Sequence, residues 1–337
     1  RFLLILTTDY QQITFVFPDY EKKETGSHKL KLTKLIIDKK EVHYTDIQTL
    51  SNIFYTGDEA SWRDVWKKWK EAFSVERVTI DFFEDYKNTF FKLRDALNKQ
   101  NISRKDSHEF TLQFLNRVMF IYFISKKDWL KYPKFMAWLW RTYLENRNKG
   151  KSEKDSFYNV WLTQVFFNAF NNRASEITKL PEEVKKTISD FPFLNGGLFS
   201  RTDKDKLNVK ISDEMFRHIL EFFEKYNFTI KEDMPLESEV AVDPQMLGYV
   251  YESLANVAEE IYDRNDMGIF YTPRVEVDFM CRRALVEYLA KQLPEIPKEK
   301  FYHLIFEPME NKEKIEGYFQ KEKLWNTLEE ALENLSV

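Results

Sequence analysis

The residues best placed to do chemistry begin at Gly268–Arg274, which reads GIFYTPR. Thr272 is a good helix N-cap, because its side-chain oxygen can accept a hydrogen bond from an early helical N–H. Pro273 then stands at the first helical position, where its missing N–H costs nothing. Apolar residues follow at helical spacing: Val277, Met280, Cys281, Ala284, Leu285, Tyr288 and Leu289. The stretch predicts a helix start, and the aromatic residues before it either contact a ligand or simply pack beside the helix end.

A second candidate is the segment 101–150, in which ten Lys and Arg face four Asp and Glu, a local balance of +6. Tryptophan and tyrosine residues are interleaved with these cations. Lysine and arginine bind DNA by neutralising phosphates and releasing counterions. The residues that we expect to contact a DNA backbone are Lys126, Lys127, Lys131, Lys134 and Arg141. The alternative is an ordinary solvated face over an aromatic core.

Other kinds of site find little support. No histidine lies three or four residues from another, so the sequence predicts no metal site. Phe17–Lys23 contains Pro-Asp and Glu-x-Lys, but in a nuclease these groups come from two paired strands, and one residue between them leaves no room for a hairpin. We interpret that stretch as a solvated loop. No glycine-rich phosphate loop occurs, and the glycine pair in Phe191–Ser200 indicates a tight turn. We therefore expect no catalytic residue in this chain.

The length, composition and net charge of the chain limit the class of protein to which it can belong. The chain has 337 residues, of which 43% are hydrophobic, enough for more than one domain. Its 8 glycines and 10 prolines against 30 phenylalanines favour a helix-rich body with few tight turns. The net charge of −4 means that a nucleic-acid surface must be a local patch. The single cysteine, Cys281, allows no internal disulfide and no thiolate zinc cluster, so we expect a reducing, cytoplasmic compartment.

The elements that position these residues follow from periodicity. Up to about residue 52, three short apolar or alternating runs predict strands in a small sheet or in the edge of a larger one. From Glu59 the period becomes helical, beginning with a Trp62, Trp66, Trp69 and Phe73 stripe. Further helices are predicted near 79–100, 107–124, 134–145, 157–171, 181–189, 213–226 and 244–263. The apolar run Phe110–Ile124 is interrupted by polar residues and is too short to span a membrane, so we expect a buried helix.

Five stretches occur in an order that resembles large single-chain type IIG restriction-modification enzymes and their N6-adenine-methylating relatives. They are Val75–Tyr86, Phe110–Leu130, Phe191–Ser200, Tyr226–Leu254 and Gly268–Arg274. The resemblance covers nearly the whole chain from about residue 60. It implies a nuclease-like domain, then a helical connector, then a methyltransferase domain.

The resemblance also implies partners and site residues. Phe270, Tyr271, Thr272 and Pro273 match the loop that contacts S-adenosylmethionine in that family. Double-stranded DNA would be the substrate, and Mg²⁺ would serve the nuclease part. Neither the methyltransferase's Asp-Pro-x-Cys-Gly-x-Gly loop nor its Asn-Pro-Pro-Tyr motif occurs in this sequence. We therefore expect an internal fragment of a prokaryotic protein that holds neither active site complete.

The sequence thus predicts an α+β fold, predominantly α-helical, with a small N-terminal strand-rich unit followed by a helical connector bundle. The expected domains are residues 1–55, at the end of a nuclease-like domain, 56–262, the connector, and 263–337, the first helices of an adenine-specific methyltransferase domain. Two alternatives stay open. One is a non-catalytic helical scaffold that binds DNA through phosphates. The other is a phage-defence methylase without a nuclease.

Overall fold

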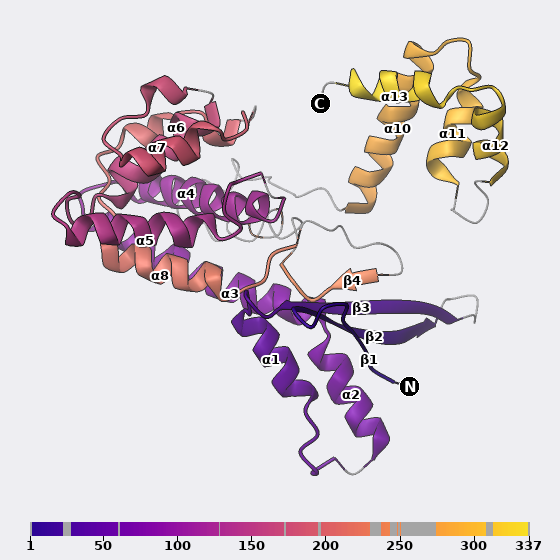
Figure 1. Ribbon diagram of the computed structural model, residues 1–337, viewed down its shortest axis with the longest axis horizontal. Helices are drawn as coiled ribbons and strands as arrows, with labels where there is room; N and C mark the ends of the chain where they lie inside the picture. Colours follow the sequence, from indigo (N-terminus) through magenta and orange to yellow (C-terminus); the bar gives the residue numbers. More distant parts are fainter. Residues whose placement is uncertain are drawn as a thin grey trace. The chain divides into compact units, whose positions relative to one another are not determined.

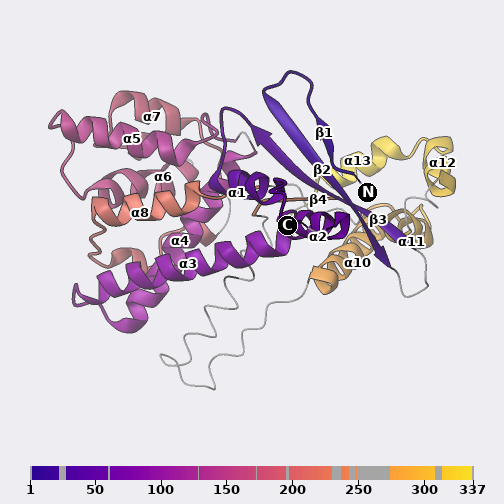
Figure 2. The same cartoon turned by 90° about the horizontal axis from the view of Figure 1, so that it is seen from below.

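The protein is described by a computed structural model, which divides into two compact units, Arg1–Gly268 and Ile269–Val337. The structure describes residues 2–22, 28–59, 61–127, 129–171, 173–194, 197–229, 237–242, 248, 250, 274–307 and 313–335. Figure 1 shows the helices and strands of each unit, and Figure 2 shows them from below. The predicted fold class, α+β and mostly helical, is confirmed.

The first unit opens with a four-stranded sheet in the order β1-β2-β3-β4. Its strands are β1 (Leu4–Leu6), β2 (Gln12–Lys22), β3 (His28–Asp38) and β4 (Glu237–Glu239). The first three are antiparallel and correspond to the three predicted runs. The fourth pairs in parallel with β3 from about 200 residues further along the chain. Such a distant pairing leaves no local signal, and sequence periodicity did not predict it.

Two sequence interpretations in this region are wrong. Phe17–Lys22 is part of β2 and not a solvated loop, and its Phe17 is only 2% exposed. The strand-like region does not extend to residue 52, because α1 (Tyr44–Ile53) is a helix. The backbone N–H of His43 donates to the Asp46 carboxylate at 2.8 Å, which supports the helix start. That local hydrogen bond outweighs the weak strand pattern.

The sheet packs on α2 (Trp62–Ala72) through β2, and α2 in turn packs on α1 (Figure 1). The ring of Phe17 lies 4.6 Å from that of Trp66 and 5.3 Å from that of Phe73, measured between centroids. Trp66 and Phe73 of the predicted aromatic stripe therefore face the sheet. Trp62, at the start of the stripe, is 48% exposed. Burial of these aromatic rings joins the sheet to the helices by the hydrophobic effect.

The rest of the first unit is a helical bundle with an aromatic core. Its helices are α3 (Val75–Asn98), α4 (Arg104–Ser125), α5 (Phe135–Asn148), α6 (Thr163–Phe167), α7 (Glu182–Ser189) and α8 (Asp213–Glu224), with a π-helical turn at Phe157–Leu162. Serine side chains cap α3, α4 and α8 by accepting from a backbone N–H three residues later. The predicted buried helix is α4, in which most residues are buried. Among the described residues, no helix has the length and apolarity needed to cross a membrane.

The second unit has its own smaller core. It contains α10 (Arg274–Gln292), α11 (Lys298–Phe306), α12 (Glu313–Lys321) and α13 (Trp325–Glu333). The end of α10 packs into this core through Val286 and Leu289, whereas Val277 and Met280 in its first turns are exposed. The apolar face expected along all of α10 is thus buried within this unit only toward its end. The expected domain limits at residues 55 and 262 stay a prediction.

Candidate nucleic-acid interface

The α4–α5 connection, residues 126–134, carries most of the cations that the sequence predicts to contact DNA. Two backbone hydrogen bonds of 3.1 Å from its first residues close the end of α4. Leu130 is buried at 3% exposure, and the Tyr132 ring stacks on that of Trp138 in α5, with 4.5 Å between centroids. The connection is therefore anchored in the core at Leu130 and Tyr132.

Lys126 faces a carboxylate of the N-terminal region. Its Nζ donates to Oε1 of Glu41 at 3.2 Å, and Nε2 of His43 lies 3.6 Å from the same oxygen. Burial alone would raise the pKa of the Glu41 carboxyl, but the His43 imidazole and the Lys126 ammonium lower it to about 2. Lys126 therefore ties the connection to the residues that follow β3, and it already has an anionic partner.

Lys127 and Lys131 each lie near an aromatic ring. Nζ of Lys127 lies 5.8 Å from the ring centroid of Trp129, and Nζ of Lys131 lies 5.8 Å from that of Tyr132. Within the part of the chain that the structure describes, neither ammonium is paired with a carboxylate. Trp129 itself is 49% exposed. The connection thus presents one cation over an exposed tryptophan and a second over Tyr132, which is a suitable arrangement for a polyanion with aromatic bases.

The remaining cations of the segment divide into two kinds. Arg141 is exposed on α5, and Lys134 is half-buried just before that helix. Arg117 and Arg147, in contrast, form ion pairs with carboxylates of Asp205 and Asp213, which are 88 and 66 residues away. Together with Lys126, at least three of the ten cations therefore form ion pairs with carboxylates outside the segment. A local count of charges could not find these partners.

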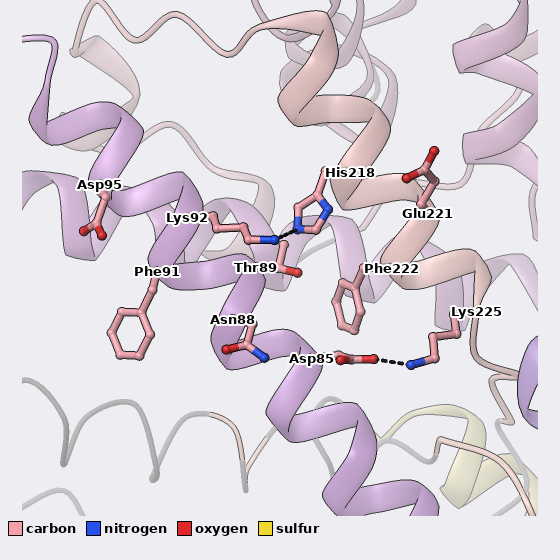
Figure 3. Close-up of a pocket in the computed structure, with 10 residues that line it drawn as sticks. All are labelled: Asp85, Asn88, Thr89, Phe91, Lys92, Asp95, His218, Glu221, Phe222 and Lys225. Carbon is pink, nitrogen blue, oxygen red and sulfur yellow. Dashed lines mark hydrogen bonds and ion pairs between the residues drawn. The ribbon is translucent and has the colours of Figure 1, made fainter.

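Sequence reasoning missed a groove of about 490 Å³ between α3 and α8, shown in Figure 3. There Nζ of Lys92 lies 3.3 Å from Nε2 of His218, and Nζ of Lys225 donates to Oδ2 of Asp85 at 2.6 Å. Burial, and next the charge of Lys92, lower the pKa of His218, so its imidazole is neutral at pH 7. Since cations and carboxylates alternate along the groove, its charge does not select an anionic backbone.

The predicted cofactor residues Phe270, Tyr271, Thr272 and Pro273 lie outside the described residues. The described part of α10 begins directly after them at Arg274, so the expected helix is present. A helix start offers unpaired backbone N–H groups, which suit a carboxylate such as that of a bound amino acid group. In the described ranges, no three His, Cys, Asp or Glu residues gather in a way that could hold a metal ion.

Comparison with known proteins finds a relative in Methanocaldococcus jannaschii described as a "putative type II restriction enzyme and methyltransferase". The two sequences are 30% identical over 200 residues, which are 59% of this chain and 16% of the relative. The matched part thus spans about a sixth of the relative's length. No protein-family model and no solved structure matches the chain. The similarity confirms the resemblance to a restriction-modification protein.

Proposed function

We propose that this chain is part of a restriction-modification protein that methylates the N6 of adenine in double-stranded DNA with S-adenosylmethionine. The relative's description supports the general activity, and the order of the five family-like stretches supports the finer, type IIG assignment. In the longer protein, a nuclease part would use Mg²⁺. A protein that acts on a prokaryotic chromosome works in the cytoplasm, which agrees with the single cysteine.

Within that protein, the helical bundle connects nuclease and methyltransferase and contacts the DNA backbone through the α4–α5 connection. The observation that carries this role is the pair Lys127 and Lys131, which meet no carboxylate among the described residues, on a connection that is anchored in the core at Leu130 and Tyr132. Lys134 and Arg141 extend the same basic segment along the chain into α5. Lys126 attaches the start of the connection to Glu41 by an ion pair. Contacts of this kind position DNA without reading its sequence.

The cofactor half of the proposal places S-adenosylmethionine at Phe270, Tyr271, Thr272 and Pro273. The helix start that follows these residues would hold the cofactor's carboxylate, and an aromatic ring would lie against the ligand. When bound, the cofactor supplies the methyl group. Calorimetric titration of S-adenosylmethionine into a longer protein containing this chain tests this half independently of the lysines, and we expect binding.

Charge reversal tests the DNA contact. We expect Lys127→Glu with Lys131→Glu to weaken duplex binding and to reduce the slope of log affinity against log salt by about 2, since about one unit is lost for each phosphate contact. The measurement is fluorescence anisotropy with duplex DNA over a range of salt concentrations.

The matched control is Lys67→Glu on α2. The wild-type Lys67 side chain is 79% exposed, and its Nζ lies 3.8 Å from Oε1 of Glu71. This variant should leave the slope unchanged. An equal slope for the wild type and the double variant would show that Lys127 and Lys131 are ordinary solvated charges, and would contradict the backbone contact.

A further inference from the structure

Trp129 is exposed to solvent, although its side chain is large and aromatic. It lies next to Leu130, which is 3% exposed, on a connection whose other aromatic residue, Tyr132, stacks on Trp138. The Trp129 residue as a whole is 49% exposed. Exposing a large aromatic ring forgoes the free energy that its burial would give. An exposed ring on an otherwise well-packed segment is therefore a candidate binding group.

The connection also holds the indole in place. Leu130 anchors it in the core directly after Trp129, and the stacked pair Tyr132 and Trp138 fixes it again two residues later. Before Trp129, the ion pair of Lys126 with Glu41 ties the end of α4 to the residues after β3. A ring presented by a fixed backbone loses less entropy on binding than one on a free loop.

The charges around the ring indicate what it would bind. Lys127 lies over the indole at 5.8 Å, and Lys131 is two residues beyond it. Each nucleotide of a single strand offers a phosphate and an uncovered base face, and proteins bind such strands with cations and stacking aromatic rings. In a duplex, the base faces are covered by their neighbours. An indole can therefore stack only where a base is unpaired and unstacked.

We propose that Trp129 stacks on an unpaired nucleobase of single-stranded DNA while Lys127 and Lys131 contact the phosphates beside it. This inference rests on the proposed DNA contact and names the form of DNA that the site prefers. It gives the connection two separable contributions. The lysines bind any DNA backbone in a salt-dependent manner, and the indole adds affinity only for accessible bases.

The test measures the affinity of the whole chain for a single-stranded oligodeoxynucleotide and for the same sequence as a duplex. We expect Trp129→Ala to weaken single-strand binding by roughly five- to tenfold, the lower part of the range for one stacked base, and duplex binding by less than about twofold. The salt slope should not change, because no phosphate contact is removed. Trp129→Phe should retain most of the single-strand affinity, since its ring can still stack.

Trp62→Ala is the matched control, because Trp62 is 48% exposed on the same unit. Its indole meets that of Trp69 edge to face, and in the described part of the chain no Lys or Arg lies over its ring. This variant should bind both DNA forms like the wild type. Thermal unfolding of all variants shows whether each is folded. If Trp129→Ala does not fold, the Trp129→Phe variant still tests the stacking role.

The outcomes separate this inference from the proposed function. If both DNA forms bind and depend on Lys127 and Lys131 but not on Trp129, the backbone contact stands and the stacking role is wrong. An equal loss for single strand and duplex in Trp129→Ala also contradicts stacking on an unpaired base. If the chain binds neither form, both proposals fail.

Discussion

At the scale of single residues, the pKa values of two carboxyl groups near the start of α1 shift in opposite directions. Glu41 accepts from Lys126 and lies beside His43, which together outweigh burial and lower its pKa to about 2. Asp46 is 1% exposed and accepts from the backbone N–H of His43, but burial raises its pKa. The hydrogen bond from His43 and the charge of Lys126 thus favour the charged form of Glu41, whereas burial favours the neutral form of Asp46.

The lowered pKa of Glu41 predicts how stability depends on pH. Because the folded state holds the proton less tightly than the unfolded state, the Glu41 carboxylate stabilises the fold above the ordinary pKa of 4.5. This contribution is lost as pH falls from about 4.5 to about 2. We expect Glu41→Gln to lower the free energy of unfolding by about 1–2 kcal/mol at pH 7 and by much less near pH 3, measured by urea unfolding.

Glu71→Gln is the control for that experiment, because the Glu71 side chain is 66% exposed in its contact with Lys67. Its effect should stay within about 0.5 kcal/mol at either pH. A constant effect of Glu41→Gln from pH 3 to pH 7 would contradict the assigned ion pair.

At the scale of elements, one arginine fixes the loop that follows α7 to the middle of α4. Arg117 is 1% exposed, and its guanidinium donates to both carboxylate oxygens of Asp205 and to the backbone carbonyls of Leu198 and Ser200. These acceptors lie in and just after the Phe191–Ser200 stretch. The planar guanidinium suits this arrangement, since it presents several donors in one plane. The stretch therefore has a structural role that its sequence did not reveal.

We expect removal of this arginine to be among the most costly single changes in the chain. Arg117→Leu leaves the buried Asp205 carboxylate without its cationic partner, which costs about 3–5 kcal/mol of unfolding free energy. Adding Asp205→Leu should recover part of that loss, because the unpaired charge is then gone. Denaturant unfolding of the single and double variants measures both effects.

The comparison for Arg117 is Arg94→Leu, since the Arg94 pair with Asp95 is partly exposed at 23% and 56%. That change should cost less than about 1 kcal/mol. If Arg117→Leu lowered the free energy of unfolding no more than Arg94→Leu does, the buried ion pair would not hold the loop.

At the scale of the whole molecule, the described residues form two hydrophobic cores, one in each unit. One runs from the sheet through α8 and includes Phe82, and the other lies among α10–α13 and includes Phe319. Both rings are 0% exposed. A unit of the smaller size buries a smaller fraction of its surface and is expected to be the less stable of the two. Each core should therefore unfold as its own cooperative step.

Substitution in each core tests this separation. We expect Phe319→Ala to lower the melting temperature of one calorimetric transition, since removing a buried phenylalanine costs about 3–5 kcal/mol. Phe82→Ala should lower the other transition and leave the first unchanged. A single transition that shifts equally in both variants would show that the units unfold together.

The sequence by itself determined the features that depend on neighbours along the chain. The three N-terminal runs became strands, the serine-capped apolar periods became α3, α4 and α8, and the order of family-like stretches pointed to a restriction-modification protein. It assigned α1 wrongly, because the Asp46 contact with the His43 backbone outweighs a weak alternation. Helix starts and strand alternation are set by local hydrogen bonds and side-chain period, so they can be recognised in a few residues.

Only the tertiary structure decided which of the predicted cations remain available. Lys126, Arg117 and Arg147 look like Lys127 and Lys131 in the sequence, but each meets a carboxylate 66 to 88 residues away. It also brought β4 to the sheet and left Trp129 exposed beside Lys127, whose ammonium meets no carboxylate among the described residues. These outcomes depend on which distant segments pack together, and charge pairing acts through space rather than along the chain.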